Sequence, residues 1–260
     1  MCTLAFYFHA FPHHPIVAGA NRDEFLSRPS AAPLQLWPSP WVCGGQDLLA
    51  GGTWLGINAN SMLVGILNRH TSAPPDLRRR SRGLLCLDVL KHDSVLKAVN
   101  SVTSQPAQHY NPFNLLIADP TTAYVIYAQE QTIETQRLTP GVHLLTNYNL
   151  NDPQCPRTAR SFQNFSQIVS YDKSQSSPST SQIFAQLRPL LASHAPDPDP
   201  RASVCLHLDG YGTCSSTMLA YSGHEHRYAY SFASGSPCRS AYHEVFIPEG
   251  GRASHPPSTM

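Results

Sequence analysis

Cys2 is the first residue whose type and position could do chemistry. It directly follows the initiator methionine, and its small side chain permits removal of Met1, which would leave Cys2 with a free α-amine. An α-amine has an unperturbed pKa of about 8, so a sizeable neutral fraction can take the thiol proton at neutral pH. Nucleophile and base would then belong to one residue, and the expected chemistry is acyl transfer.

Two further segments near the N-terminus could assist that chemistry. Arg22 in the polar run 21–24 favours a thiolate, and Asp23 can orient an amine. The glycine-rich run 51–56 resembles a turn that leads into a strand. Asparagine side chains and backbone N–H groups could supply an oxyanion hole. The residues alone leave a second interpretation open, in which Cys2 is a small apolar strand residue and Arg22 and Asp23 pair to brace a turn.

The elements that must position these residues are mainly strands, followed by helices that cover them. Apolar runs and turn residues predict strands at 3–8, 16–19, 54–58, 62–68, 113–118, 123–127, 142–147, 203–208, 216–221, 227–232 and 243–247. Helical periodicity predicts helices at about 83–99, 156–168 and 181–193. This order favours an α+β fold in which helices cover sheets, as one domain over residues 1–249 with a flexible tail at 250–260.

Length and composition restrict the class of protein. The chain has 260 residues, of which 13% are charged and 41% hydrophobic, and this excludes wholesale disorder. A net charge of +1 gives no reason to expect a nucleic-acid partner. The apolar runs are too short for a membrane span. We therefore expect a small-molecule substrate or ligand as partner, while the oligomeric state stays undetermined.

The cysteines and histidines predict no metal site and no required cofactor. The seven cysteines are scattered without a C-x-x-C pair, and the N-terminus lacks the basic region of a secretory signal. Reduced thiols in the cytoplasm are the expectation. His224 and His226 would share one face of a strand and could bind a metal, but we favour surface histidines. The basic run 78–82 is interpreted as a solvated loop or helix start, with a phosphate clamp as the second interpretation.

Seven motifs, in order along nearly the whole chain, resemble the NRDE family, also called the transport and Golgi organisation 2 proteins. They are MCTLAF at 1–6, NRDEF at 21–25, GGTWLGIN at 51–58, SRGLL at 81–85, FNLL at 113–116, LLTN at 144–147 and YGTCSSTML at 211–219. The resemblance implies membership of the N-terminal nucleophile hydrolase superfamily, with a four-layer αββα sandwich. Bile-salt hydrolases and penicillin V acylases are relatives of that superfamily.

The resemblance also implies roles for single residues. Cys2 matches the nucleophile, and Arg22 and Asp23 match the Arg and Asp that hold it. Asn68 and Asn147 resemble the two asparagines of the oxyanion hole. We further expect substrate contacts from Asn21, Thr53 and Trp54. The residue type of Trp54 alone favours a core position, whereas the implied fold places it near the cleft. Where the family usually has Arg in Y-G-T-R-S-S-T, this chain has Cys214.

Three functions follow as expectations. The first is a cysteine hydrolase or acyltransferase that acts on an amide, ester or thioester of a mostly neutral small molecule through an acyl-Cys2 intermediate. The second is a non-catalytic carrier of haem or acyl-CoA on the same fold, since the resemblance implies haem handling and an association with mitochondria; the pair Cys155-Pro156 is a weak haem-binding signal. A structural or interaction role comes third.

Overall fold

The first two strands show how the layers of the molecule form. In β1 (Thr3–Phe11), Leu4, Phe6 and Phe8 belong to one apolar core, whereas Ala5 and Tyr7 belong to another. Successive side chains of a strand point to opposite faces, so β1 is buried on both sides. In the computed structural model, which describes residues 2–169, 177–195 and 199–247, this strand lies in a sheet between a second sheet and a helix layer.

The described residues form two antiparallel seven-stranded sheets. The first has the order β10-β1-β2-β12-β13-β14, with β11 paired to β12. Besides β1, its strands are β2 (His14–Phe25), β10 (Gly141–Leu145), β11 (His207–Leu208), β12 (Tyr211–Ser222), β13 (Arg227–Ala233) and β14 (His243–Glu244). The second sheet runs in chain order through β3 (Ser30–Pro38), β4 (Trp41–Asp47), β5 (Leu55–Asn58), β6 (Leu63–Asn68), β7 (Phe113–Ala118), β8 (Ala123–Ala128) and β9 (Ile133–Arg137).

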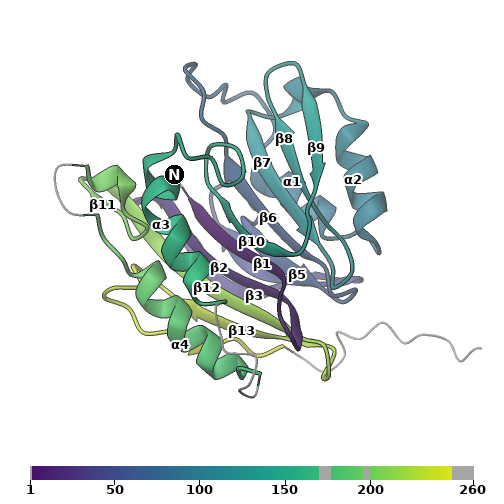
Figure 1. The fold of residues 1–260 in the computed structure, drawn as a ribbon. Helices are drawn as coiled ribbons and strands as arrows, with labels where there is room; N and C mark the ends of the chain where they lie inside the picture. The colour runs from purple at the N-terminus through teal and green to yellow at the C-terminus, as the bar shows by residue number, and fades with distance from the viewer. Residues whose placement is uncertain (1, 170–176, 196–198, 248–260) are drawn as a thin grey trace, which may run out of the picture.

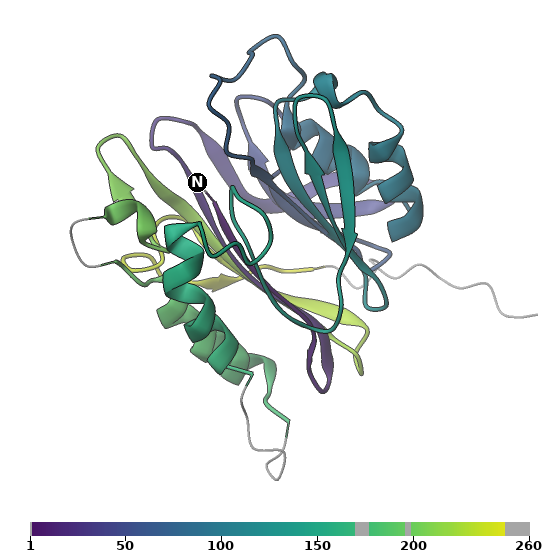
Figure 2. The same ribbon diagram turned by 45° about the horizontal axis from the view of Figure 1, so that its top comes forward.

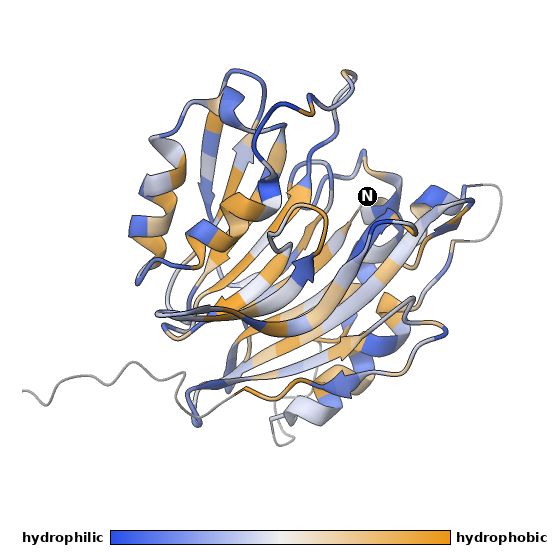
Figure 3. Cartoon of the chain, turned by 180° about the vertical axis from the view of Figure 1, so that it is seen from behind, coloured by the Kyte–Doolittle hydropathy of each residue, from blue (hydrophilic) through white to orange (hydrophobic). Residues whose placement is uncertain are grey.

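Four helices cover the two outer faces. α1 (Arg82–Val89) and α2 (Val95–Thr103) pack through Leu85, Val89 and other apolar residues on the second sheet. α3 (Pro156–Gln167) and α4 (Thr180–Leu191) pack through Phe165 and Leu187 on the first sheet. Figures 1 and 2 show these helix pairs on opposite sides of the paired sheets, and Figure 3 shows the hydrophobic residues concentrated on the strands between them.

This arrangement confirms the predicted α+β fold and its four αββα layers. Most predicted strands are present, and the helices predicted at 156–168 and 181–193 correspond to α3 and α4. None of the helices in the described residues has the length and apolar character that a membrane crossing requires. The predicted tail and its boundary at residue 249 lie outside the described residues.

One predicted helix was wrong in its extent. The run 83–99 is divided into α1 and α2, because Leu90 ends the first helix and the Ser94 hydroxyl caps the second by accepting from the Lys97 N–H. The apolar spacing continues through the break and conceals it. Strands β3, β4 and β9 were not individually predicted. β3 and β9 are largely exposed and carry little apolar signal, and β4 contains Gly44 and Gly45, which are typical of turns.

Candidate active site

Cys2 lies directly before β1, at the end of the space between the two sheets. It is half-buried and packs against the intersheet core on the same side as Leu4. Its Sγ is 3.7 Å from the main-chain oxygen of Asp23 on the neighbouring strand β2. Burial raises the pKa of the Cys2 thiol, and the charge of Asp23 adds to this, while Arg22 opposes it. A thiol in this environment needs a nearby base to become a nucleophile.

Arg22 and Trp54 meet beside Cys2. Arg22 is buried, and its guanidinium carbon lies 4.5 Å from the centroid of the Trp54 ring. One Nη of Arg22 is 3.7 Å from an Asp47 carboxylate oxygen, whereas Nη1 has no hydrogen-bond partner among the described residues. Cys2 and Trp54 also line a small intersheet cavity of about 20 Å³, which is room for one water-sized group.

Asp23 points to the opposite face of the same sheet. Its Oδ2 lies 2.8 Å from Nη1 of Arg157 on α3, and its Oδ1 accepts from the Thr213 hydroxyl at 2.7 Å. Arg157 Nη1 also lies 2.7 Å from the Thr3 hydroxyl, next to Cys2 in sequence. Burial raises the pKa of Asp23, and the Arg157 charge opposes the rise. The carboxylate thus braces the backbone that carries Cys2.

Asn21 and Thr53 occupy scaffold positions. Asn21 borders the small cavity, but its amide group donates to the Leu191 and Val204 carbonyls at 2.8 and 2.9 Å, on the helix side of the sheet. The Thr53 hydroxyl is buried and donates to the Leu55 carbonyl at 3.1 Å. These hydrogen bonds position β2 and the turn before β5. The substrate contacts expected of both side chains stay predictions.

Asn68 and Asn147 line one cavity of about 270 Å³. Asn68 ends β6 and is exposed, while Asn147 follows β10 and is buried. Leu67 borders the small cavity beside Cys2, and the next residue, Asn68, borders the larger one. The structure therefore brings Asn68 and Asn147 to one cavity, while their role in an oxyanion hole stays a prediction.

Arg82 at the start of α1 borders the larger cavity. It lines that cavity and donates from Nη1 to the Pro112 carbonyl at 3.0 Å. Burial lowers the pKa of Arg82, and the negative form of Cys2 opposes this. The basic run was interpreted mainly as a solvated loop or helix start, which did not single out Arg82.

A hydrogen-bond network holds the turn that carries Asn147. Arg69 donates to Asn114 Oδ1 at 2.8 Å and to Asn149 Oδ1 at 2.7 Å. Asn114 in turn donates to the carbonyls of Thr146 and Tyr148, which flank Asn147. The FNLL motif thus supplies a positioning residue, Asn114, that sequence reasoning did not assign.

Cys214 and Cys155, which the sequence analysis singled out, lie in different surroundings. Cys214, at the usual family Arg position, lies at an irregular register of β12, with Sγ 3.4 Å from the Glu24 carbonyl. Cys155 is buried and directly precedes α3, and its Sγ lies 3.5 Å from the Thr146 hydroxyl. Pro156 forms the first residue of α3. The Cys-Pro pair therefore serves as a helix start and does not fit a haem ligand.

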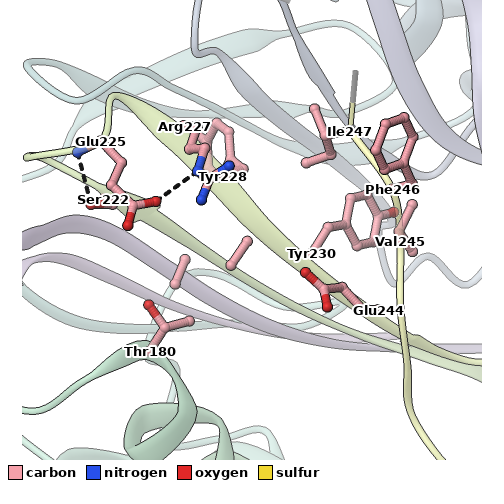
Figure 4. A pocket seen from close by; sticks show the side chains of 12 residues that line it. Thr180, Ser222, Glu225, Arg227, Tyr228, Tyr230, Glu244, Val245, Phe246 and Ile247 are labelled. Atoms are coloured by element: carbon pink, nitrogen blue, oxygen red, sulfur yellow. Dashed lines mark hydrogen bonds and ion pairs between the residues drawn. The ribbon is translucent and has the colours of Figure 1, made fainter. Parts of the chain in front are cut away.

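The largest opening that we describe is elsewhere in the molecule. It has a volume of about 490 Å³ and is bordered by Ser222, Arg227, Glu244 and Phe246, at the edge formed by β13 and β14 (Figure 4). Ser222 is seven residues along β12 from Ser215, which pairs with Arg22. At about 3.3 Å per residue this is roughly 23 Å from the level of Cys2. At this distance the opening is separate from the predicted nucleophile, although it is the largest one described.

The family is shown by sequence comparison. Residues 1–230 match the family described as Transport and Golgi organisation 2. The Homo sapiens "Transport and Golgi organization protein 2 homolog" is 30% identical over 246 residues, covering 84% of this chain and 88% of that protein. The Mus musculus homologue is 28% identical over 253 residues, covering 87% and 90%.

Solved structures with a similar fold are hydrolases by name. A Caenorhabditis elegans N-acylethanolamine-hydrolyzing acid amidase orthologue has a TM-score of 0.59 at 13% identity, covering 84% of this chain and 92% of its own. Penicillin V acylase from Agrobacterium tumefaciens has a TM-score of 0.56 at 14% identity, covering 90% and 83%. A mutant conjugated bile acid hydrolase from Clostridium perfringens has a TM-score of 0.54 at 9% identity, covering 96% and 98%. This chain belongs to the transport and Golgi organisation 2 family and has the N-terminal nucleophile hydrolase fold.

Proposed function

We propose that this protein is a cysteine hydrolase or acyltransferase that works through an acyl-Cys2 intermediate. The observation that carries the proposal is the grouping of Cys2, Arg22 and Trp54 at the end of the intersheet space, and the shared cavity of Asn68 and Asn147 supports it. The substrate would be an amide, ester or thioester of a mostly neutral small molecule.

The reaction would begin after removal of Met1. The neutral α-amine of Cys2 takes the thiol proton, and Sγ forms a bond to the substrate carbonyl carbon. Asn68 and Asn147 donate hydrogen bonds to the oxyanion. Collapse of the intermediate breaks the bond to the amine, alcohol or thiol, which leaves with the proton from the α-ammonium. Water, or an amine acceptor, then attacks the acyl-thioester and restores the Cys2 thiol.

Arg22 has a specific part in this proposal. Its guanidinium is buried, and Nη1 has no hydrogen-bond partner among the residues that the structure describes. A buried donor without a partner is unfavourable unless something else satisfies it. We assign it to the Cys2 thiolate, whose formation it favours by charge.

Comparison with known proteins supports the reaction class of this proposal. The solved structures of similar fold are named as an amidase, an acylase and a bile acid hydrolase, which all cleave acyl bonds. The curated family relatives carry names that state no reaction. Acyl transfer is therefore the reaction class proposed, with the acyl group left open.

The proposal is tested by intact-protein mass spectrometry with a reactive acyl donor such as p-nitrophenyl acetate. We expect a chain without Met1 that gains one acetyl group on Cys2, located by peptide mapping, and releases p-nitrophenolate with turnover. Cys2→Ala should abolish turnover while circular dichroism stays unchanged. Cys86→Ala, which removes a thiol buried in the core between α1 and the second sheet, is the control and should retain turnover.

Two outcomes would contradict the proposal. One is full turnover in Cys2→Ala. The other is a retained Met1 without any adduct, combined with thermal stabilisation by haem or acyl-CoA that survives Cys2→Ala, which would identify a carrier instead.

A further inference from the structure

Four metal-binding side chains converge at one corner of the first sheet, apart from the proposed nucleophile. They are His194 after α4, Cys205 before β11, His207 in β11 and Cys238 in the segment after β13. One ligand atom from each lies within 4.8 Å of those of the other three. Two thiols and two imidazoles are the donor set that Zn²⁺ prefers in structural sites.

The distances among Cys205, His207 and Cys238 match a tetrahedral site, and the His194 ligand atom lies within 4.8 Å of theirs. Cys205 Sγ lies 3.6 Å from Cys238 Sγ and 3.7 Å from His207 Nε2. Cys238 Sγ and His207 Nε2 are 3.2 Å apart. A tetrahedral zinc with Zn–S bonds of about 2.3 Å and Zn–N bonds of about 2.0–2.1 Å separates its ligand atoms by about 3.3–3.8 Å. An ion therefore fits among these atoms with small adjustments.

The histidine orientations agree with the same geometry. His207 directs Nε2 toward both sulfur atoms. His194 Nδ1 lies 2.9 Å from the Cys205 carbonyl, so it donates there and leaves Nε2 to bind a metal. Metal-binding histidines usually donate their other ring N–H in this way, which sets the ring orientation and the tautomer.

We propose that His194, Cys205, His207 and Cys238 bind one Zn²⁺ as a structural site. The protein would supply all four ligands, which leaves no open position for a substrate or an activated water. The ion would join the segment after α4, the start of β11 and the segment after β13. This site is separate from the Cys2 chemistry and does not depend on it.

The segments that the ion would join contact Thr213, whose hydroxyl binds Asp23. The Leu206 N–H donates to the Thr213 hydroxyl at 2.8 Å, and the same hydroxyl donates to Asp23 Oδ1. The Ser236 hydroxyl, two residues before Cys238, donates to the Thr213 carbonyl at 2.9 Å. Bound zinc would therefore stabilise the two segments that position Thr213.

Sequence spacing alone did not indicate this site. The ligands follow one another at intervals of 11, 2 and 31 residues, so no C-x-x-C pair is present. The histidines that sequence did suggest, His224 and His226, lie in the turn between β12 and β13 instead of on a strand. The strand geometry that would have let them share a metal is therefore not formed.

The test is zinc binding by the full chain, purified under reducing conditions and reconstituted with Zn²⁺ alone. We expect one zinc per chain by elemental mass spectrometry after dialysis. Cys238→Ser and His194→Ala should each weaken zinc affinity more than about 100-fold, because loss of a mere outer-shell partner already weakens it roughly 10- to 100-fold. Both residues are exposed, so circular dichroism should show an unchanged fold.

Cys214→Ser is the matched control, because Cys214 is a half-buried thiol outside the cluster, and it should retain full zinc affinity. Removal of zinc by a chelator should lower Tm in the wild type and in Cys214→Ser, but not in Cys238→Ser. The proposal is overturned if the reduced wild type retains no stoichiometric zinc, or if Cys238→Ser binds zinc as tightly as the wild type. A Cys205–Cys238 disulfide that persists in the zinc-reconstituted protein would overturn it as well.

Discussion

The Asp23–Arg157 pair stands out among single residues, because both charges are almost completely buried. Their side chains are 0% and 3% exposed, and they also bond Thr213 and Thr3. Removing one partner of such a pair leaves the other charge buried without compensation, which typically destabilises a fold by about 3–5 kcal/mol. The pair therefore matters to stability as well as to the placement of Cys2.

We predict that Arg157→Met lowers the free energy of unfolding by about 3–5 kcal/mol, measured by urea denaturation. Adding Asp23→Asn should restore part of the loss, since the uncompensated carboxylate is then removed. Arg160→Met on the exposed side of α3 is the control and should change stability by less than about 0.5 kcal/mol. Equal losses of unfolding free energy in Arg157→Met and Arg160→Met would show that the ion pair contributes nothing specific.

Among the elements, the turn before β5 and the start of α1 form the closest contact near the site. The Thr53 N–H donates to the Gly83 carbonyl at 3.0 Å. A Cβ on Gly52 would lie 2.1 Å from the Gly83 carbonyl carbon and 2.4 Å from the Leu84 nitrogen. Glycine is required at position 52 because these neighbours are backbone atoms that cannot rotate away.

Gly52→Ala should therefore destabilise the protein by about 3 kcal/mol, the upper part of the usual range for overpacking. It should also displace α1, and with it Arg82, from the cavity of Asn68 and Asn147. Differential scanning calorimetry would measure the first effect. Gly223→Ala is the matched control, because its Cβ would meet its nearest neighbour at an ordinary 3.4 Å, and a comparable loss there would refute the steric argument.

For the whole molecule, buried neutral histidines make stability depend on pH. Burial lowers the pKa of His143, and its hydrogen bond to the Thr139 carbonyl opposes this. Burial also lowers the pKa of His14. Below the ordinary histidine pKa of about 6.5, the unfolded chain binds protons that the folded chain excludes. Stability should therefore be fully present above about pH 6.5 and fall as the pH decreases.

We expect the free energy of unfolding to decrease from pH 7.5 to pH 5, by at most about 1.4 kcal/mol per pH unit for each such histidine. His143→Gln should make this decrease less steep in urea titrations across the same pH range. His109→Gln, at an exposed histidine, serves as the control and should leave the slope unchanged. A slope that is identical in the wild type and His143→Gln would count against the argument.

Local patterns in the sequence predicted much of the fold, because they depend on neighbouring residues. The apolar runs at 3–8 and 16–19 predicted the first two strands, and Cys2, Arg22 and Trp54 do share the intersheet side. The break between α1 and α2 was missed, since a polar cap at Ser94 interrupts an apolar spacing that continues past it. Asn68 and Asn147 were chosen by motif resemblance, and their common cavity follows only from the packing of the loops after β6 and β10.

The sequence by itself determined most of the strands, the family and the identity of the predicted nucleophile, because apolar runs and motifs consist of residues close together in the chain. The tertiary structure alone decided which distant side chains meet. Arg157 reaches Asp23 across 134 residues, and the cysteine and histidine cluster assembles from three separate segments. Such contacts arise when helices and loops pack on the completed sheets. Periodicity describes only neighbouring residues, so it does not predict contacts between distant ones.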